Sequence, residues 1–471
     1  MTVAGGATFI LPTSIAVTTV VSGATLEPGA LLALQDPTVD AGGVLSLTAG
    51  TATTGAVVSS GGVLDGPGEL KGDAANFDYG TISGAALGDV HGGRGELDVE
   101  SGGVASGVLE AGTADYLLVE SGGVAVAANV TGAQALLVVE AGGLISNTVL
   151  AGADTAIFGS ASGTQVSGGG VEYVEAGGST VGTDMLSGGG EYVSSGGAAT
   201  SAVVGSGGLL RVAYGGKADG AVVEAGGAET LFAGGLASWN VLSGGCQYDY
   251  GKASNTVIRS GGNEVVNGGA VASASVISSG GREVVSSGGV AEATTVSSGG
   301  TLLVVSGGQI TSGLTFKGGT ATISGTMGAG QTVHFTGASA ELQLDNLASF
   351  HAQISGMSAP GQKVDLGGFV FSSIETAVWS QSGTSGTLTI TDGAKKATLD
   401  LIGTYVTGDF HLSTDGAGGT FVDDPPSPAA VRFAAAMAGF NGRDAGFVAV
   451  HSGGTSLMST LPLATAATSG R

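Results

Sequence analysis

The sequence has few of the residues on which ordinary enzymes and disulfide-stabilised proteins depend. Of its 471 residues one is cysteine, 9 are proline, 5% are aromatic and 11% are charged. The single cysteine, Cys246, excludes an intramolecular disulfide. So low a charge content is unfavourable for a catalytic centre, which needs clustered titratable side chains. No run of about 18 apolar residues occurs, so no transmembrane segment is expected.

Basic residues are especially scarce. Lys and Arg number 14 against 38 Asp and Glu, which gives a net charge of −24. An acidic surface argues against binding to nucleic acid or to anionic membranes, because both need a basic face. The chain is still 42% hydrophobic, enough to form a core. The composition fits a soluble protein that is secreted or displayed on a surface.

Glycine, in contrast, is abundant, at 92 residues. Each glycine inside a helix costs roughly 1 kcal/mol relative to alanine, so the composition disfavours helix. Many of the glycines form small-Gly-Gly triplets at regular intervals. The first residues of one set are Ser187, Ser206, Ala225, Ser243, Ser260, Ser279, Ser298 and Lys317. A second set lies between them, at Ala176, Ser195, Tyr214, Ala233, Asn267, Ser287 and Ser306.

This spacing defines a repeat of about 19–20 residues with two glycine corners, which is the signature of a solenoid. Stacked coils would align Val265, Val284 and Leu303 in one ladder, at a spacing of about 4.8 Å. We therefore predict an all-β protein, a single-stranded parallel β-solenoid, taken as right-handed from the general preference of parallel strand connections. Two corners per repeat favour a flattened two-sided coil, and a third, irregular corner remains open.

The repeats divide the chain into four parts. Residues 1–40 contain three prolines and are the expected N-terminal cap, and residues 41–325 are the expected solenoid. Residues 326–425 alternate like strands and either continue the solenoid or cap it. Residues 426–471 follow a double proline, and a short helix is expected over 431–440, with Ser427 and Pro428 as its start.

The repeat units S-S-G-G-x-x-x-V and V-E-S-G-G-V resemble those of AIDA-type adhesin and autotransporter passenger domains, over about residues 41–325. The stretch from Ala397 to Thr420 is similar to the C-terminal region of large exported repeat proteins of alphaproteobacteria. The resemblance implies a protein exported to the outside or outer surface of a Gram-negative bacterium, with a role in adhesion, aggregation or biofilm. Because the N-terminus lacks a typical secretory signal, we expect either an export signal within residues 426–471 or a passenger fragment.

Acidic residues supply the only candidates for a metal site, and calcium is the cation that they would bind. Glu100, Glu120 and Glu140 precede glycine corners at intervals of 20 and would stack as a ladder of carboxylates. Asp415, Asp423 and Asp424 lie around a glycine-rich turn. A solvated edge and a solvated turn are the simpler interpretations, so no metal or other cofactor is assigned.

Two other sets of side chains are candidates for glycan chemistry. Serines at the corners, including Ser195, Ser279, Ser287 and Ser298, would carry O-linked sugars if the resemblance to AIDA-type adhesins extends to glycosylation. The simpler interpretation is that these serines only form turns. Trp239, Tyr248 and Tyr250 occur where the repeat shortens; they would either stack on sugar rings or, as the simpler interpretation, pack over an irregular coil.

The leading functional hypothesis is a non-catalytic rod that binds host-cell or bacterial surfaces, with glycans as candidate ligands. No catalytic residue is assigned, because no histidine occurs in a recognisable catalytic motif. The main alternative is a polysaccharide lyase or glycosidase built on a β-helix. Such an enzyme would need either a pair of acidic residues or an Arg or Lys with bound calcium in a groove. A carrier rod that displays another domain is a third hypothesis.

Overall fold

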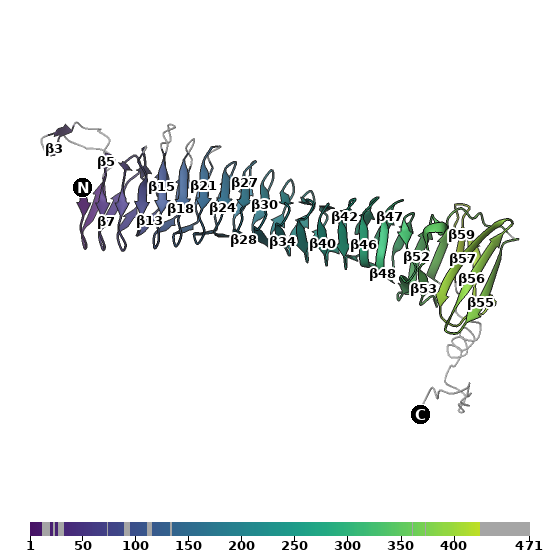
Figure 1. The fold of residues 1–471 in the computed structure, drawn as a ribbon. Helices are drawn as coiled ribbons and strands as arrows, with labels where there is room; N and C mark the ends of the chain where they lie inside the picture. Colours follow the sequence, from purple (N-terminus) through teal and green to yellow (C-terminus); the bar gives the residue numbers. More distant parts are fainter. Residues whose placement is uncertain are drawn as a thin grey trace, which may run out of the picture. The chain divides into compact units, whose positions relative to one another are not determined.

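The computed structural model describes residues 1–11, 19–21, 24–26, 33–72, 74–88, 95–110, 115–131, 134–359, 361–372 and 374–423. All of them belong to one unit, Met1–Pro425. This unit is a parallel β-solenoid of about 17 turns with about 19 residues per coil, followed by a C-terminal β region (Figure 1). At one strand spacing per coil, the stack is on the order of 80 Å long. Within these residues, no helix is long and apolar enough to span a membrane.

The first side of the solenoid contributes one strand from each coil, and in the central coils this strand has four residues. Neighbouring strands pair in parallel and without a shift, so that Val265 lies beside Val284, and Val284 beside Leu303. The predicted ladder is therefore confirmed. The strands of this side in the central coils are β24 (Asp154–Ile157), β27 (Val171–Val174), β30 (Gly190–Val193), β33 (Leu209–Val212), β36 (Ala228–Leu231), β39 (Cys246–Asp249), β42 (Asn263–Val266), β45 (Arg282–Val285) and β47 (Thr301–Val304).

The second side contributes two strands per coil, separated by a bend. In one coil these are β43 (Val271–Ser273) and β44 (Val276–Ile277), with Ala274 between them at a φ of 57°. In β46 (Val290–Ser297) the strand continues across the bend. The bend residues with a left-handed backbone include Ala127, Asn147, Ser201, Trp239, Asn255, Ala274, Ala293 and Ser312. The bend is the third corner that the sequence left open. It recurs from coil to coil and lies within the second side, whose strands all belong to one sheet.

The two glycines of each corner have different structural roles. Gly280 has a φ of 74°, a conformation that residues with a Cβ atom rarely adopt. Gly281 has an ordinary φ, but a Cβ atom there would lie 2.4 Å from the carbonyl oxygen of Ile258 in the preceding coil. The corners also hydrogen-bond along the stack, since the Gly280 N–H donates to the Gly299 carbonyl at 2.9 Å. Paired glycines therefore let the corner both turn and stack.

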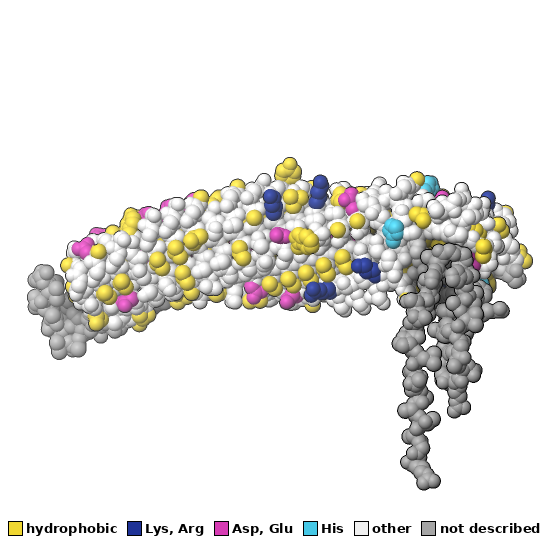
Figure 2. All heavy atoms as spheres, turned by 90° about the horizontal axis from the view of Figure 1, so that it is seen from below, with side chains coloured by type: hydrophobic (Ala, Val, Ile, Leu, Met, Phe, Trp, Pro, Cys, Tyr) yellow, Lys and Arg dark blue, Asp and Glu magenta, His cyan; other side chains and the backbone are white. Residues whose placement is uncertain are grey.

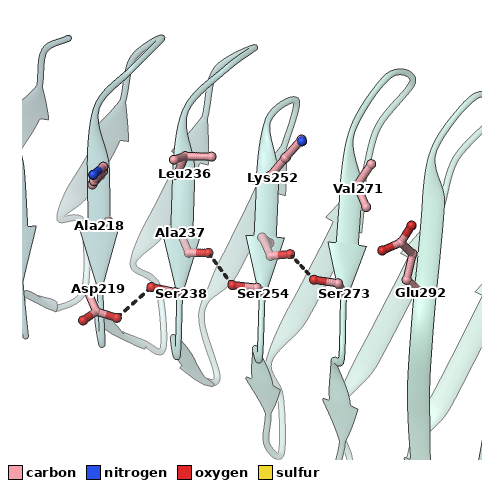
Figure 3. A pocket seen from close by; sticks show the side chains of 12 residues that line it. Ala218, Asp219, Leu236, Ala237, Ser238, Lys252, Ser254, Val271, Ser273 and Glu292 are labelled. Carbon is pink, nitrogen blue, oxygen red and sulfur yellow. Dashed lines mark hydrogen bonds between the residues drawn. The ribbon is translucent and has the colours of Figure 1, made fainter. Parts of the chain in front are cut away.

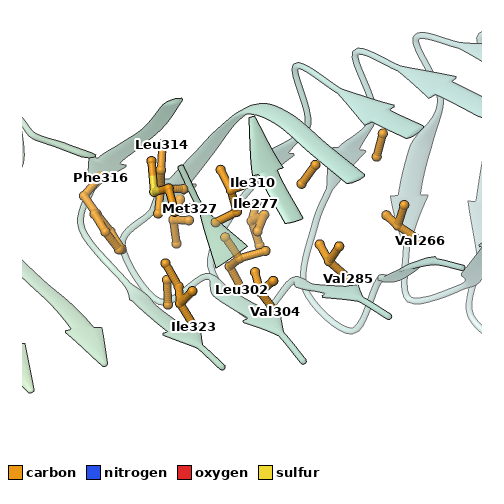
Figure 4. Close-up of a cluster of buried hydrophobic side chains, with 14 of the residues drawn as sticks. Val266, Ile277, Val285, Leu302, Val304, Ile310, Leu314, Phe316, Ile323 and Met327 are labelled. Atoms are coloured by element: carbon orange, nitrogen blue, oxygen red, sulfur yellow. The ribbon is translucent and has the colours of Figure 1, made fainter. Parts of the chain in front are cut away.

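The interior of the coils is filled by Val, Leu, Ile and Ala from both sides. Val266, Val285 and Val304 are buried one above the other, opposite Ile277 and Ile310 (Figure 4). Toward the C-terminal end the core becomes aromatic, and the rings of Phe316 and Phe335 stack with their centroids 5.1 Å apart. Each coil buries its apolar side chains only against its neighbours, so stability depends on stacking.

The described N-terminal residues add strands to the coil stack. Strand β1 (Thr2–Val3) pairs in parallel with β6 (Thr38–Val39), and β2 (Thr8–Leu11) pairs with β7 (Val44–Leu47). The described part of residues 1–40 therefore begins the coil stack, because its strands add to the same sheets. An antiparallel pair, β3 (Thr19–Val21) and β4 (Ala24–Leu26), also lies within this segment.

Residues 326–423 combine the two alternatives that the sequence left open. Strands β52 (Ser339–Leu344) and β54 (Gly361–Leu366) still add in parallel to the first side. The chain then turns antiparallel, through β55 (Thr376–Ser382), β56 (Ser385–Asp392) and β57 (Lys395–Ile402). It ends with β58 (His411–Thr414) and β59 (Thr420–Asp423), of which β59 pairs antiparallel with β54. The solenoid therefore continues beyond residue 325 and is then covered by antiparallel strands.

The helical content of the described residues is two short 3-10 turns, η1 (Leu347–Ser349) and η2 (Thr407–Asp409). The short helix expected over 431–440, like the rest of 426–471, lies outside the described residues.

Candidate functional site

A groove of about 630 Å³ runs along the second side of the solenoid, across several successive coils (Figure 3). Its outward-facing residues come from β34 (Lys217–Asp219), β37 (Leu236–Ser238), β40 (Lys252–Ser254), β43 and β46. One row, aligned by the strand register, consists of Lys217, Leu236, Lys252 and Val271. A parallel row consists of Asp219, Ser238, Ser254, Ser273 and Glu292.

Charge and hydroxyl groups give this groove a mixed character. Ser238 donates to the Asp219 carboxylate at 2.7 Å, and Ser254 donates to the Ala237 carbonyl at 3.3 Å. Lys217 and Lys252 are exposed and lie two coils apart, about 10 Å by strand spacing. Among the described residues, the ion pair that forms joins Lys71 and Glu69. Lys217 and Lys252 therefore form no ion pair with a described carboxylate. Two free ammonium groups beside apolar and hydroxyl surface are suited to an anionic polar ligand.

The three aromatic residues singled out from the sequence all lie on the outside of the solenoid. Trp239, Tyr248 and Tyr250 are 64%, 38% and 47% exposed. They also occupy different places: Trp239 is the bend residue next to the groove, Tyr248 faces outward on β39, and Tyr250 follows that strand. Only Trp239 therefore adjoins the groove as an exposed ring. The surface in view in Figure 2 has few charged side chains, with hydrophobic groups scattered among them.

A second chemical feature lies inside the solenoid. Five glutamates at the second position of first-side strands point into the core and are at most 1% exposed. We call them the acidic row: Glu172, Glu191, Glu229, Glu264 and Glu283. The row is interrupted by Leu210 and Gln247 and is followed by Leu302. Adjacent members are one strand spacing apart, so two ionised carboxylates there would repel by about 3 kcal/mol even at an effective dielectric constant of about 20.

Small polar side chains from the second side bond to the acidic row. Thr183 donates to Glu172 at 2.7 Å, and Thr180 donates to Glu191. Asn240 donates to Glu229 at 2.6 Å, and Ser275 donates to Glu264 at 2.9 Å. These bonds cross the interior from one side of the coil to the other. They satisfy part of the hydrogen-bonding capacity of the row.

Burial shifts the titration of these groups upward. Removal from water raises the pKa of Glu172 to about 7 and those of Glu191 and Glu229 to about 8. Burial also raises the pKa of Glu264, and it raises that of Glu283 well above the ordinary range. Burial is the main cause in every case, because an ionised carboxylate loses its hydration in the core. Burial therefore favours the protonated form of every member of the row.

The acidic row was missed at the level of sequence, although a signal for it exists. Each member stands at the fourth position of a Gly-Gly-x-Glu motif. The glutamates singled out from the sequence stand before the corner instead: Glu100, Glu120 and Glu140. Side chains along a strand point alternately inward and outward. The second residue after a corner points inward, so the glutamates at that position are buried, whereas those that stand before a corner are not.

The described candidate metal ligands lie in two places, at the corners of successive coils and around a turn near the C-terminal end of the β region. Glu100, Glu120 and Glu140 lie at the same corner of three successive coils, and all three are half-buried. The N–H of Glu120 donates to the Val99 carbonyl of the preceding coil at 2.9 Å, and the N–H of Glu140 donates to the Val119 carbonyl at 2.9 Å. Asp415 is occupied by its own turn, accepting from the N–H groups of Ala417 and Gly419 at 2.7 Å. Asp423 lies on β59, and Asp424 lies outside the described residues. In the described part of the chain, no group of three or more His, Cys, Asp or Glu could hold a metal ion.

The candidate serines lie on the outside of the corners. Ser195, Ser279, Ser287 and Ser298 are all exposed. Each lies against the positive-φ glycine of the next coil; the Ser279 Oγ would be 2.7 Å from a Cβ atom at Gly299. Their hydroxyl groups therefore form part of two accessible edges along the stack.

Comparisons with known proteins found a family match and a similar solved structure. Residues 244–300 match the family described as "Adhesin of bacterial autotransporter system, probable stalk". A crystal structure of a TibC-catalysed hyper-glycosylated TibA fragment is similar at 27% sequence identity and a TM-score of 0.43, covering 64% of this chain and 99% of that one. No curated protein sequence matches. The resemblance of the repeats to AIDA-type adhesin stalks is thus confirmed over residues 244–300.

Proposed function

We propose that this chain is the stalk of an exported or surface-displayed adhesin that acts without catalysis in adhesion, aggregation or biofilm. The observation that carries the proposal is the uninterrupted stacking of repeats whose central part matches an adhesin stalk family. A stack that gains stability from each added coil can hold a binding surface at a distance from a cell. The outer surface of a Gram-negative bacterium is the location that fits this role.

The groove supports glycans as the ligand. A sugar polymer with carboxylate or sulfate groups would meet the ammonium groups of Lys217 and Lys252, the serine hydroxyls of the parallel row, and the exposed ring of Trp239 beside it. Exposed aromatic rings stack on the apolar faces of sugars. Successive coils present similar groups at a regular interval, which suits a repeating polymer.

The arrangement of acids argues against a glycosidase, which is one form of the enzyme alternative. The two carboxylates of the groove, Asp219 and Glu292, are four coils apart in one register row, about 19 Å. Glycosidases need a pair about 5–9.5 Å apart. The closely spaced acids of the acidic row are buried, so a sugar would not reach them.

O-glycosylation of Ser195, Ser279, Ser287 and Ser298 is part of the same proposal. It is supported by their exposure at the corners, where an attached sugar would extend into solvent without displacing the core. Intact-mass measurement of protein from the native host tests it. Increments the size of a hexose or heptose are expected, and an unmodified mass would contradict it.

Fractionation of the native host tests the proposed function. The full chain should appear in the medium or on the cell surface, and the same cells should adhere or aggregate more than cells that lack it. A version without residues 426–471 would locate an export signal there if it stays inside the cell. Retention of the full chain in the cytoplasm, or unchanged adhesion on its loss, would contradict the proposal.

A further inference from the structure

The interior of the described coils contains buried acidic side chains but no buried basic ones. The buried polar and charged side chains of the described residues are Asp, Glu, Asn, Gln, Ser and Thr, and no Lys, Arg or His is among them. The acidic row therefore has no cation to balance it. An ionised carboxylate in such a place would be unpaired, which proteins rarely tolerate.

The titratable groups that face each member of the row are other acids. Glu172 and Glu191 face each other across one coil step, with Thr155, Thr164, Thr180 and Thr183 around them. Glu229 faces Asn240 and Gln247. Glu264 lies beside Glu283, Gln247 and Asp249, with Ser275 and Thr256 opposite, and Glu283 faces Thr294.

Hydrogen bonding also favours the protonated form. Oxygens without a partner remain on Glu172, Glu191, Glu229, Asp249 and Glu283, although these side chains are fully enclosed. Thr183 lies 2.7 Å from Glu172 and 3.4 Å from Glu191, yet its hydroxyl has one proton to donate. A protonated carboxyl can itself donate, either to a threonine oxygen or to a neighbouring acid. A carboxylate can only accept.

We propose that folding of the stalk is coupled to proton uptake by the acidic row, so that the central coils close with these side chains as carboxylic acids and open more readily as the pH rises. The proposal does not depend on the stalk being an adhesin. It concerns the coils from β27 to β45, where the row lies.

The direction of the pH dependence follows from the shifts. The unfolded glutamates titrate near 4.5, whereas the pKa of Glu191 and Glu229 in the fold is about 8. Between these values the fold holds protons that the unfolded chain releases. Stability is therefore highest below about pH 4.5 as far as this row is concerned, and it falls as the pH rises through about 8. Each such group increases the unfolding constant about tenfold per pH unit inside that window.

The first experiment follows urea unfolding of the full chain by circular dichroism from pH 5 to pH 8 at constant ionic strength. The midpoint should fall steadily as the pH rises. A variant in which all five members of the row are changed, Glu172→Gln, Glu191→Gln, Glu229→Gln, Glu264→Gln and Glu283→Gln, should have a clearly shallower slope. The slope should not become flat, because burial also raises the pKa of Asp78, Glu110 and Asp249 outside the row. Gln247 already occupies the row, so the fold accepts the amide there.

A control with nearly as many changes but no carboxyl group removed replaces the exposed corner serines Ser195, Ser279, Ser287 and Ser298 by Ala, and its slope should equal that of the unchanged chain. A midpoint that stays flat or rises between pH 5 and pH 8, or an equal slope in the row variant, would overturn the proposal.

The second experiment does not require any variant to fold. The infrared spectrum of the unchanged chain at pH 6 should contain the carbonyl stretch of protonated carboxylic acids. That band should persist well above the pH at which exposed carboxyls ionise, and it should vanish on unfolding at the same pH. Absence of the band in the folded protein at pH 6 would overturn the proposal.

Discussion

The hydroxyl of Thr183 lies 2.7 Å from the carboxyl of Glu172, across the interior of one coil. Both side chains are at most 1% exposed, and the hydroxyl comes from the second side of the coil while the acid comes from the first. The same arrangement recurs farther along the stack, where Ser275 bonds Glu264. The two sides of the solenoid are thus joined by polar contacts as well as by apolar packing.

Replacing Thr183 by Val should destabilise the stalk by about 1–3 kcal/mol, because the isosteric side chain leaves a buried Glu172 oxygen without its donor. Urea unfolding at pH 6 measures the change. Thr200→Val, at an exposed position on β31 (Ala198–Thr200), is the control and should shift the free energy of unfolding by less than about 0.5 kcal/mol. Equal effects of the two changes would contradict the role of the buried bond.

Replacing Glu191 by Leu should change the free energy of unfolding in a pH-dependent way, and the variant should gain stability relative to the unchanged chain as the pH rises. Leu210 and Leu302 occupy the same row, so a leucine is compatible with the interior. Because burial raises the pKa of Glu191 to about 8, keeping the acid costs more free energy at pH 8 than at pH 5. The difference in stability between variant and unchanged chain should move in favour of the variant by about 2–4 kcal/mol over this range. Parallel pH curves would refute this expectation.

Replacing Gly281 by Ala should destabilise the stack by about 1–3 kcal/mol, because the new Cβ atom would meet the Ile258 carbonyl oxygen at 2.4 Å. Gly328→Ala is the matched control, since a Cβ atom there meets nothing within 4 Å and neither glycine has a positive φ. Thermal unfolding compares the two. A larger loss for the Gly328 change would show that close stacking does not determine the need for glycine.

Replacing Lys217 and Lys252 by Ala should weaken binding to an acidic polysaccharide such as polygalacturonate, by roughly fivefold for each lysine at low salt. The double change Lys317→Ala and Lys396→Ala removes the same charge from exposed positions outside the groove and should have little effect. Binding to neutral dextran is the second reference. If both double variants lose affinity equally, net charge and not the groove determines binding.

Much of the solenoid could be predicted because the length of one coil equals the spacing of the Gly-Gly triplets along the sequence, about 19 residues. A parallel stack without register shifts places residues one repeat apart side by side, so the spacing of 19 from Val265 to Val284 is enough to align them. The paired glycines could also be recognised as corners from the sequence. One glycine allows the positive φ of the turn, and the other leaves room for the backbone of the preceding coil. The bend was harder to predict, because Ala274, Trp239 and Asn255 share a backbone conformation but no side-chain type.

The candidate sites were predicted less well, since each depends on which way a side chain faces. Glu140 and Glu172 are both glutamates near a glycine corner, yet one is half-buried at an edge and the other is enclosed. The groove joins Lys217 and Lys252 from coils two repeats apart, and nothing in either repeat alone indicates a shared surface.

The sequence by itself therefore determined the repeat, the strand ladders and the likeness to adhesin stalks, because these follow from periodicity along one chain. Tertiary structure alone decided that the first residues join the stack, that antiparallel strands cover its other end, and that five glutamates lie in the core without a basic partner. The physical reason is that burial is a property of the whole coil. A glutamate on the first side is solvated or hydrogen-bonded to a buried threonine depending on which residues the second side of the coil places opposite it.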